Sequence, residues 1–362
     1  MNITFAGGGT GGHLFPAIAI ADELKKIQPD VNITFIGTKD KIEARVVPQR
    51  GYNFAPIWIS GFRRKLTMSN LLFPVKVAVA IIESFFLMKK LKPDVVVGTG
   101  GYVCGPPLFA ATVLGIPTLI QEQNSFPGAT TRTLASRVSE VHLTFESSKG
   151  FLKRLDNVRV SGNPTSARFG SVSREEGAKC FSLSPSANTL LVFGGSLGAT
   201  SINEEIAKIL TALIDLNLQL IWQTGHTDFE RIEALHRSNP AVRVLKFIEQ
   251  MEFAYAASNV AVCRAGASTL AELTIVGLPS ILIPYPFAAA DHQTENAKTM
   301  VASGAAVMIK DIDLSRELLP TIKSLSADRM RLQTMSRNAK QLGKPEAATT
   351  LAQAVTRLAS KN

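Results

Sequence analysis

Short runs of apolar and β-branched residues alternate with longer stretches of helical periodicity along all 362 residues of the chain. This alternation is typical of βαβ units built around a parallel sheet. In the first half of the chain, the predicted strands cover residues 3–6, 33–36, 55–59, 95–97, 118–120 and 141–144. In the second half, they cover residues 190–193, 219–223, 243–247, 260–263, 280–284 and 306–309.

The two halves of the chain follow the same plan. The segments "ITFAGGGTGGH" and "LLVFGGSLGA" each combine a strand, a glycine turn and a helix. We therefore predict an α/β protein with two Rossmann-like, doubly wound domains, over residues 1–163 and 164–340, that face each other across a cleft. Residues 341–362 are expected to form a helix that returns to the N-terminal domain. Ligands of such sheets bind at the carboxyl ends of the strands, so glycine loops would line the cleft.

Composition and charge favour a globular protein with an anionic partner. Hydrophobic residues make up 46% and charged residues 19% of the chain, and the formal net charge is +10. No basic stretch is interleaved with aromatic residues, which argues against nucleic acid as a partner. The three cysteines lack CxxC spacing, which favours a reducing cytoplasm and argues against zinc. Because the sequence shows no obvious cluster of metal ligands, we predict neither a catalytic metal nor a cofactor.

Four glycine loops follow predicted strands, at residues 7–12, 98–101, 194–198 and 266–269. Glycine lets backbone N–H groups approach a ligand, and the helix after each loop directs its positive end toward a phosphate. The simpler interpretation is that these glycines only make tight turns, but it explains one loop better than four. We predict that the loops bind a diphosphate.

Three other enzyme classes use similar loops, and each fits less well. Gly7-x-Gly9-x-x-Gly12 resembles a dinucleotide fingerprint, yet the next predicted strand is followed by Gly37-Thr38-Lys39, with no acidic residue for a ribose. His13 stands where the P-loop of an NTPase requires lysine. Gly194-x-Ser196-x-Gly198 fits the nucleophile elbow of a hydrolase, but that interpretation would explain only one of the glycine loops.

The loop "CRAGASTLAEL" carries the most chemical information. It places Ser268 or Thr269 near a helix N-terminus and Glu272 one turn later. A carboxylate there can accept hydrogen bonds from both hydroxyls of a ribose while the helix end faces the phosphates. Alternatively, Ser268 or Thr269 forms a capping arrangement with Glu272, and the two interpretations are compatible.

Seven motifs occur in the order typical of a known family, at residues 9–13, 100–102, 122–124, 162–164, 194–198, 264–272 and 291–296. With these motifs the sequence resembles the bacterial N-acetylglucosaminyltransferases that convert lipid I to lipid II in peptidoglycan synthesis. The resemblance implies a GT-B glycosyltransferase with UDP-N-acetylglucosamine as donor. The implied acceptor is lipid I, which is N-acetylmuramoyl-pentapeptide on undecaprenyl diphosphate. Transfer to its 4-hydroxyl would invert the anomeric centre and release UDP.

The resemblance also implies which residues bind the donor. Glu272 would bind the ribose, the backbone around Ile248 would contact the uracil edge, and Gln293 and Asn296 would contact sugar hydroxyls. The family usually has an arginine where this chain has Ser166. We expect Arg168, two residues later, to replace the contact that this arginine makes. The complete implied donor set is Thr10, Gly11, Gly12, Asn124, Arg168, Ser196, Ile248, Arg264, Ala267, Ser268, Thr269, Glu272, Gln293 and Asn296.

The acceptor would bind to the N-terminal domain, where the resemblance implies that its diphosphate meets Gly12, Gly100, Gly101 and Tyr102. His13 is our candidate catalytic base, because an imidazole titrates close to neutral pH. Glu122 is the alternative base, and His13 would then only bind substrate or cap its helix. Helix ends and backbone N–H groups would stabilise the departing UDP.

Residues 63–92 form the most hydrophobic region, although Pro74, Lys76 and Glu83 argue against a membrane span. The simpler interpretation is a helix buried in the N-terminal domain. Because basic residues flank the apolar run and the family's acceptor is a lipid, we expect contact with an anionic membrane surface, the cytoplasmic face of the bacterial plasma membrane. The predicted membrane contacts are Leu72, Phe73, Val75 and Val79. Cell-division or elongation proteins are expected as further partners.

Two alternative functions remain open. A UDP-N-acetylglucosamine 2-epimerase or another UDP-sugar transferase would use the same architecture, although an epimerase has little use for an apolar helix with basic flanks. A UDP-sugar sensor without catalytic activity would leave His13 unexplained.

Overall fold

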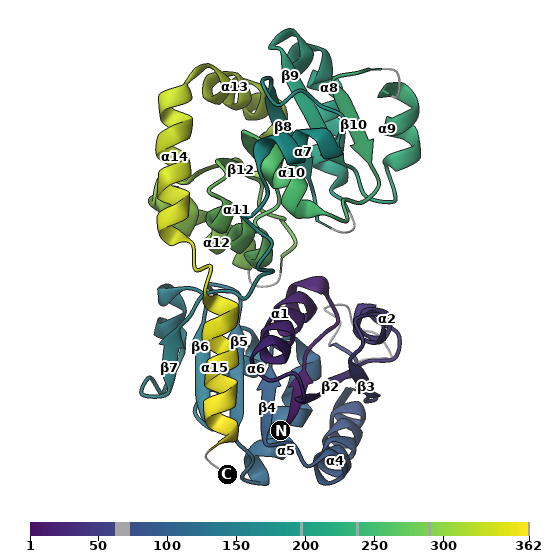
Figure 1. The fold of residues 1–362 in the computed structure, drawn as a ribbon, viewed down its shortest axis with the longest axis vertical. Coiled ribbons are helices and arrows are strands. Elements are labelled where there is room, and N and C mark those ends of the chain that lie inside the picture. Colours follow the sequence, from purple (N-terminus) through teal and green to yellow (C-terminus); the bar gives the residue numbers. More distant parts are fainter. Residues whose placement is uncertain (62–72, 196–197, 237–238, 289–290, 361–362) are drawn as a thin grey trace. The chain divides into compact units, whose positions relative to one another are not determined.

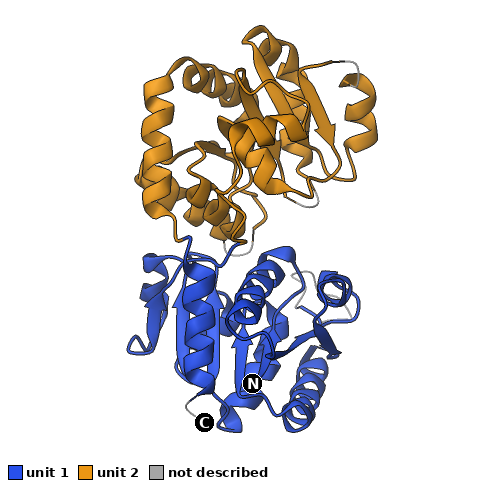
Figure 2. Ribbon diagram, viewed as in Figure 1, with its two compact units in different colours: residues 1–165, 345–362 blue, residues 166–344 orange. Residues whose placement is uncertain are grey.

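The computed structural model describes residues 1–61, 73–195, 198–236, 239–288 and 291–360 (Figure 1). The chain forms two compact units (Figure 2). Unit 1 comprises residues 1–165 and 345–362, and unit 2 comprises residues 166–344. Each unit is built around one parallel sheet, which confirms the predicted class of two Rossmann-like α/β domains.

The sheet of unit 1 has the strand order β3-β2-β1-β4-β5-β6-β7. Its strands are β1 Asn2–Ala6, β2 Asn32–Gly37, β3 Asn53–Pro56, β4 Val95–Gly98, β5 Thr118–Glu122, β6 Glu140–Leu143 and β7 Val158–Val160. The central strand β1 pairs Ile3 with Ile33 of β2 on one side and with Val95 of β4 on the other. The order of the strands therefore reverses between β1 and β4, the place where open α/β sheets bind ligands.

Helices cover both faces of this sheet. They are α1 Gly11–Ile27, α2 Ile42–Gln49, α4 Phe73–Leu91, α5 Gly105–Val113, α6 Ala129–Leu134 and α15 Ala347–Ala359, with 3-10 turns η1 Tyr102–Cys104 and η2 Glu146–Phe151. On one face, Phe5 packs in a core with Leu14 of α1 and Leu351 of α15. On the other face, Val96 belongs to a core with Leu108 of α5. Burial on both faces explains why the central strands are continuous apolar runs.

The helix α15 follows unit 2 in the sequence but packs along α1 in unit 1 (Figure 1). Leu351, Val355 and Leu358 lie on its buried face. At its C-terminal end, Arg357 Nη2 donates to both carboxylate oxygens of Glu140, each at 2.8 Å. The end of the chain is thus part of the core of unit 1.

Unit 2 repeats the plan with the strand order β10-β9-β8-β11-β12-β13. Its strands are β8 Asn188–Phe193, β9 Leu218–Gln223, β10 Val242–Leu245, β11 Val260–Cys263, β12 Ser280–Leu282 and β13 Ala306–Met308. Its helices are α7 Arg174–Cys180, α8 Thr200–Asp215, α9 Phe229–His236, α10 Met251–Ala257, α11 Ala267–Val276, α12 His292–Ala302, α13 Leu314–Ala327 and α14 Arg329–Leu342, with the turn η4 Asp311–Asp313. The order of strands reverses between β8 and β11.

Every strand predicted from the sequence corresponds to a strand of the structure, and most of their ends agree within two residues. Two differences remain. The strand β3 covers Asn53–Pro56, earlier than the predicted 55–59, and β7 Val158–Val160 was not predicted. β7 is a three-residue edge strand with Arg159 at its centre, so it carries no apolar pattern that distinguishes it from a loop.

Candidate functional site

In unit 1, the loops that follow β1, β4 and β5 lie next to one another, because these three strands are neighbours in the parallel sheet. The loop after β1 contains the glycines of residues 7–12, and the loop after β4 contains Gly100 and Gly101. A Cβ atom on Gly7 would lie 2.1 Å from Thr99 Oγ1, so the first two loops are in direct contact. The structure therefore brings the predicted glycine loops of the N-terminal half together at the point where the strand order reverses.

His13 lies in the first turn of α1 and packs against the loop after β4. Its Nδ1 is 3.3 Å from the carbonyl oxygen of Gly8 and 3.1 Å from Thr10 Oγ1. Gly100 and Gly101 both have a positive φ, and a Cβ on Gly100 would lie 2.8 Å from His13 Cδ2. These two glycines therefore provide both the backbone conformation and the space that the imidazole ring needs.

Glu122, the alternative base, ends β5 and is almost completely buried. Its Oε1 accepts from the backbone N–H of Asn124 at 3.1 Å and from Asn124 Nδ2 at 3.3 Å. Its Oε2 accepts from the N–H of Gly128 at 2.9 Å and from Thr131 Oγ1 at 2.6 Å. Both carboxylate oxygens are thus engaged within unit 1, and they hold the loop from Asn124 to the start of α6.

Tyr102, predicted to contact the acceptor, lies beside the loop after β1, where a Cβ on Gly9 would be 3.4 Å from its ring. Burial is the main cause that raises the pKa of the Tyr102 hydroxyl, and the neighbouring charge of Glu43 adds to it. Glu43 is a buried carboxylate of α2 that also contacts Gly8 and Gly9. The sequence motifs did not single out Glu43, because it stands outside the glycine-rich segments.

In unit 2, Gln223 connects two parts of the predicted donor site. It ends β9, and its Nε2 donates to the carbonyl oxygen of Gly195 at 2.9 Å. Its Oε1 accepts from the backbone N–H of Ile248 at 2.7 Å. The glycine loop after β8 and the segment expected to contact uracil are therefore joined by one side chain, which the sequence analysis did not identify.

Glu272 lies on α11, and its carboxylate contacts Tyr255 rather than a capping partner. The Tyr255 hydroxyl donates to Glu272 Oε2 at 2.7 Å. Burial raises the pKa of Glu272 to about 7, and the hydrogen bond from Tyr255 partly opposes this effect. The capping interpretation is wrong, because α11 begins at Ala267 with Gly266 as its N-cap residue and no side-chain cap.

Arg264 contacts the protein through both terminal nitrogens of its guanidinium group. Nη1 pairs with Asp311 and donates to the carbonyl oxygens of Ile283 and Pro284, at 3.3 and 3.2 Å. Nη2 donates to Ser201 Oγ at 2.9 Å. This arrangement favours a role in holding the loops of unit 2 in place over a direct contact with the donor.

The remaining predicted donor residues of unit 2 lie in three places. Gln293, in the first turn of α12, accepts from the backbone N–H of Tyr285 at 2.9 Å, and the fully buried Asn296 donates to the carbonyl oxygen of Ala265 at 3.3 Å. Ala267, Ser268 and Thr269 form the first turn of α11. Arg168 is exposed and pairs with Glu252 of α10 at 3.2 Å. Ser196 lies outside the described residues.

Three helices that begin at the glycine loops have uncapped N-termini. The N-cap residues of α1, α8 and α11 are Thr10, Ala199 and Gly266, and none makes a side-chain cap among the described residues. No acidic residue stands in the first turn of these helices. By contrast, α7 has a complete capping box from Ser173 and Glu176. Helix ends whose N–H groups lack a side-chain cap and whose first turn holds no acidic residue are suited to binding an anion.

The helix α4 carries an exposed apolar face. Val75, Ile82 and Phe86 are 52%, 55% and 70% exposed, and their spacing of seven and four residues places them on one side of the helix. Phe73 and Val79 are partly exposed, and Leu72 lies outside the described residues. Within the described part of the chain, no helix is long and apolar enough to cross a membrane. The same residues contain no group of three or more histidine, cysteine and acidic side chains that could hold a metal ion.

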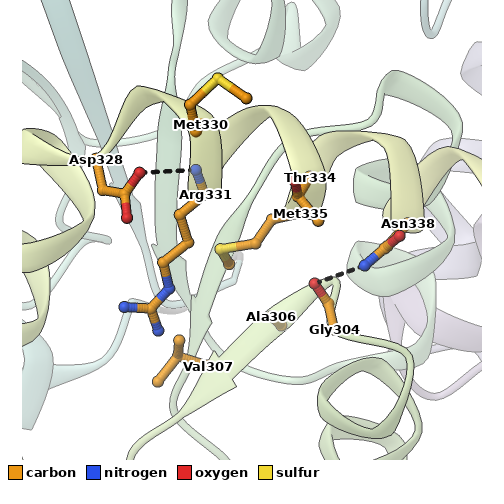
Figure 3. Close-up of a pocket in the computed structure, with 9 residues that line it drawn as sticks. All are labelled: Gly304, Ala306, Val307, Asp328, Met330, Arg331, Thr334, Met335 and Asn338. Atoms are coloured by element: carbon orange, nitrogen blue, oxygen red, sulfur yellow. Dashed lines mark hydrogen bonds between the residues drawn. The ribbon is translucent and has the colours of Figure 1, made fainter.

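A separate pocket lies at the edge of the sheet in unit 2, between β13 and α14 (Figure 3). Arg331 and Met335 extend from α14 toward the strand, and Asn338 Nδ2 donates to the carbonyl oxygen of Gly304 at 3.3 Å. None of the predicted site residues lines this pocket. It is therefore distinct from the glycine loops.

Comparison with known proteins shows similarity over nearly the whole chain. Residues 3–143 match the N-terminal domain of glycosyltransferase family 28, and residues 189–351 match its C-terminal domain. A UDP-N-acetylglucosamine–N-acetylmuramyl-(pentapeptide) pyrophosphoryl-undecaprenol N-acetylglucosamine transferase of Chlorobaculum tepidum is 46% identical over 360 residues, or 98% of each chain. The protein of the same name from Salinibacter ruber is 42% identical over 361 residues, which cover 99% of this chain and 97% of the relative.

Solved structures agree with this similarity. The crystal structure of MurG from Acinetobacter baumannii has a TM-score of 0.77 and 30% identity, over 98% of this chain and 99% of that chain. A UDP-GlcNAc 2-epimerase from Neisseria meningitidis has a TM-score of 0.68 over 99% of this chain and all of that chain, but its 14% identity indicates a shared fold alone. On the sequence motifs, the two α/β units and these full-length relatives, the chain belongs to the UDP-N-acetylglucosamine–N-acetylmuramyl-(pentapeptide) pyrophosphoryl-undecaprenol N-acetylglucosamine transferases of glycosyltransferase family 28.

Proposed function

We propose that this protein transfers N-acetylglucosamine from UDP-N-acetylglucosamine to the 4-hydroxyl of undecaprenyl-diphospho-N-acetylmuramoyl-pentapeptide, forming lipid II and UDP in peptidoglycan synthesis. The observation that carries this proposal is the position of His13, in the first turn of an uncapped helix and against Gly100 and Gly101. A basic side chain next to open backbone N–H groups suits a reaction that deprotonates a hydroxyl beside a diphosphate.

Unit 2 would bind the donor. The open N-termini of α8 and α11 would face the diphosphate, together with Ser196 and the backbone near Ala267, Ser268 and Thr269. Glu272 would accept hydrogen bonds from the ribose hydroxyls, and the segment at Ile248 would contact uracil. Gln293 and Arg168 complete the proposed donor set, whereas the fully buried Asn296 and the engaged Arg264 would hold the surrounding loops.

Unit 1 would bind the acceptor diphosphate with Gly12, Gly100, Gly101 and Tyr102. Thr10, Gly11, Gly12 and Asn124 would contact the donor sugar during the reaction. This assignment places the acceptor diphosphate on the same glycine loops that hold His13, which lets one site both bind the lipid and activate its sugar.

His13 would act as general base through Nε2. Its Nδ1 lies next to the carbonyl oxygen of Gly8, an acceptor, so the tautomer with a proton on Nδ1 and a lone pair on Nε2 fits this environment. In the reaction, the 4-hydroxyl oxygen forms a bond to the anomeric carbon as its proton passes to Nε2. The bond between that carbon and the diphosphate oxygen breaks, and helix N-termini stabilise the charge on UDP.

The lipid acceptor requires that the protein reach a membrane. We propose that the exposed face of α4, with Phe73, Val75, Val79, Ile82 and Phe86, enters the anionic cytoplasmic surface of the bacterial plasma membrane. Lys89 and Lys90 in the last turn of the helix supply the positive charge for anionic headgroups. Cell-division or elongation proteins are further proposed partners.

The test is release of UDP from UDP-N-acetylglucosamine by purified protein, with and without a short-chain lipid I analogue. Release that requires the analogue, with formation of the disaccharide, supports the transferase. Isomerisation of the donor without an acceptor would instead indicate a 2-epimerase, and donor binding without turnover would indicate a sensor.

A further inference from the structure

Glu43 is a fully buried acidic residue next to the loop that carries His13. It stands in the first turn of α2, and its exposed fraction is 0%. A carboxylate is rarely removed from water unless several donors replace the lost hydration. The contacts of Glu43 therefore indicate what it does in unit 1.

Both oxygens of the Glu43 carboxylate accept hydrogen bonds. Oε2 accepts from the backbone N–H of Gly9 at 2.9 Å. Oε1 accepts from the backbone N–H of Thr38 at 3.1 Å and from Thr38 Oγ1 at 2.8 Å. Because Thr38 directly follows β2 and Gly9 follows β1, one side chain connects the ends of two neighbouring strands.

Two glycines make room for this side chain. A Cβ on Gly8 would lie 2.4 Å from Glu43 Cδ, and a Cβ on Gly37 would lie 2.5 Å from Glu43 Cγ. Any side chain at either position would displace the carboxylate. Gly8, in the loop after β1, and Gly37, the last residue of β2, are therefore both required by Glu43.

The contact continues from Glu43 to His13. The carboxylate packs on Gly8, whose carbonyl oxygen lies 3.3 Å from His13 Nδ1. The same carbonyl oxygen lies 3.0 Å from the position of a Cβ on Gly101. A shift of Gly8 or Gly9 would thus move the carbonyl oxygen that faces His13 Nδ1. The proposed basic atom is the other ring nitrogen, Nε2.

We infer that Glu43 is a positioning residue of the transfer reaction, which holds Gly8 and Gly9 so that His13 keeps its tautomer and orientation. This inference rests on the proposed function. Glutamine has almost the same shape as glutamate but only one acceptor oxygen. In Glu43→Gln, an NH₂ group must face either the N–H of Gly9 or the two donors of Thr38, so the loop loses part of its support.

The test compares Glu43→Gln with Asp40→Asn, which removes the same charge from an exposed side chain in the preceding turn, 75% accessible and outside the proposed site. We expect Glu43→Gln to lower kcat about tenfold or more, with the KM for UDP-N-acetylglucosamine changed less than about twofold. The Gly9 amide proton, shifted downfield by its bond to a carboxylate, should move upfield in an NMR spectrum of the same variant. Asp40→Asn should change none of these quantities.

Wild-type kcat in Glu43→Gln would overturn the inference, whether or not the Gly9 amide signal moves. If Glu43→Gln does not fold, Glu43→Asp replaces it, because aspartate keeps the charge but places the oxygens one methylene further from Gly9. An intermediate kcat with an unchanged KM supports the inference, and an unchanged kcat overturns it. Failure of the proposed function is recognised separately, since wild-type protein would then release no UDP with the lipid I analogue.

Discussion

The hydroxyl of Tyr255 on α10 donates a 2.7 Å hydrogen bond to Oε2 of Glu272 on α11. Burial raises the pKa of Glu272 to about 7, and this hydrogen bond is the contact that counteracts it. Phe169 and Phe193 pack their ring edges against Tyr255, at centroid distances of 5.7 and 6.0 Å. The two phenylalanine rings therefore hold the tyrosine ring whose hydroxyl contacts the carboxylate.

Replacement of Tyr255 by Phe should weaken donor binding. Without this hydrogen bond the ionised carboxylate is less favoured and the pKa of Glu272 rises further, so the Kd for UDP-N-acetylglucosamine at pH 7 should rise about threefold or more. Isothermal titration calorimetry measures this change. The matched control is Tyr52→Phe, which removes a hydroxyl that donates to Asp22 in unit 1 and should leave the Kd unchanged. Equal affinity of Tyr255→Phe and wild type would contradict the proposed role of the pair.

Donor affinity should depend on pH through Glu272. Its pKa is raised to about 7 in the free protein, so the carboxylate is protonated below that pH and ionised above it. An ionised carboxylate accepts from both ribose hydroxyls, so affinity should fall by up to about tenfold per pH unit below about pH 7 and level off above it. UDP-N-acetylglucosamine is the suitable ligand, because its diphosphate diester does not titrate in this range. A flat profile in wild type, or an unchanged slope in Glu272→Gln, would argue against this assignment.

Replacement of His13 by Ala should remove turnover without unfolding the protein. General base catalysis contributes about 10²–10⁴-fold, so kcat should fall by that factor while the Kd for UDP stays close to wild type. Single-turnover assays with the lipid I analogue measure the chemical step. A variant with more than half of the wild-type kcat would exclude His13 as the base.

Replacement of Glu122 by Gln should lower the free energy of unfolding, because Glu122 is proposed to hold its loop and not to act as the base. The carboxylate accepts four hydrogen bonds within its own loop, and glutamine cannot accept all of them. We expect a loss of about 1–3 kcal/mol in the free energy of unfolding, measured by urea denaturation. Full stability combined with a loss of kcat equal to that of His13→Ala would instead favour Glu122 as the base.

Polar substitutions on α4 should weaken membrane binding. We expect the triple variant of Val75, Ile82 and Phe86 to Ser to bind anionic vesicles about tenfold or more weakly, because three exposed apolar side chains no longer enter the interface. Vesicle sedimentation measures binding, and UDP affinity should stay unchanged. Ile312→Ser is the control, since Ile312 is 88% exposed but belongs to unit 2. An unchanged vesicle affinity of the triple variant would refute the proposed surface.

The alternation of apolar runs and glycine turns predicted the strands correctly, because parallel strands buried on both faces must be short and continuously apolar. The edge strand β7 was not predicted, since an edge position lets Arg159 remain exposed. The residues of the glycine loops could likewise be identified from the sequence, because glycine after a strand has a specific backbone purpose. The strands and the glycine loops could be predicted because both depend on residues that are close together in the sequence.

The roles of the polar residues depended on contacts between distant segments. Glu43, Gln223 and Tyr255 stand in ordinary sequence surroundings, and each becomes informative only when the fold places it beside Gly9, Ile248 or Glu272. Glu122 and Arg264 stand in motifs of the sequence, but their hydrogen bonds to their own unit could not be read from spacing. By itself, then, the sequence determined the fold class, the family and the position of the glycine loops. Only the tertiary structure decided which buried carboxylates and amides hold those loops, because hydrogen-bond partners are set by distances across the sheet.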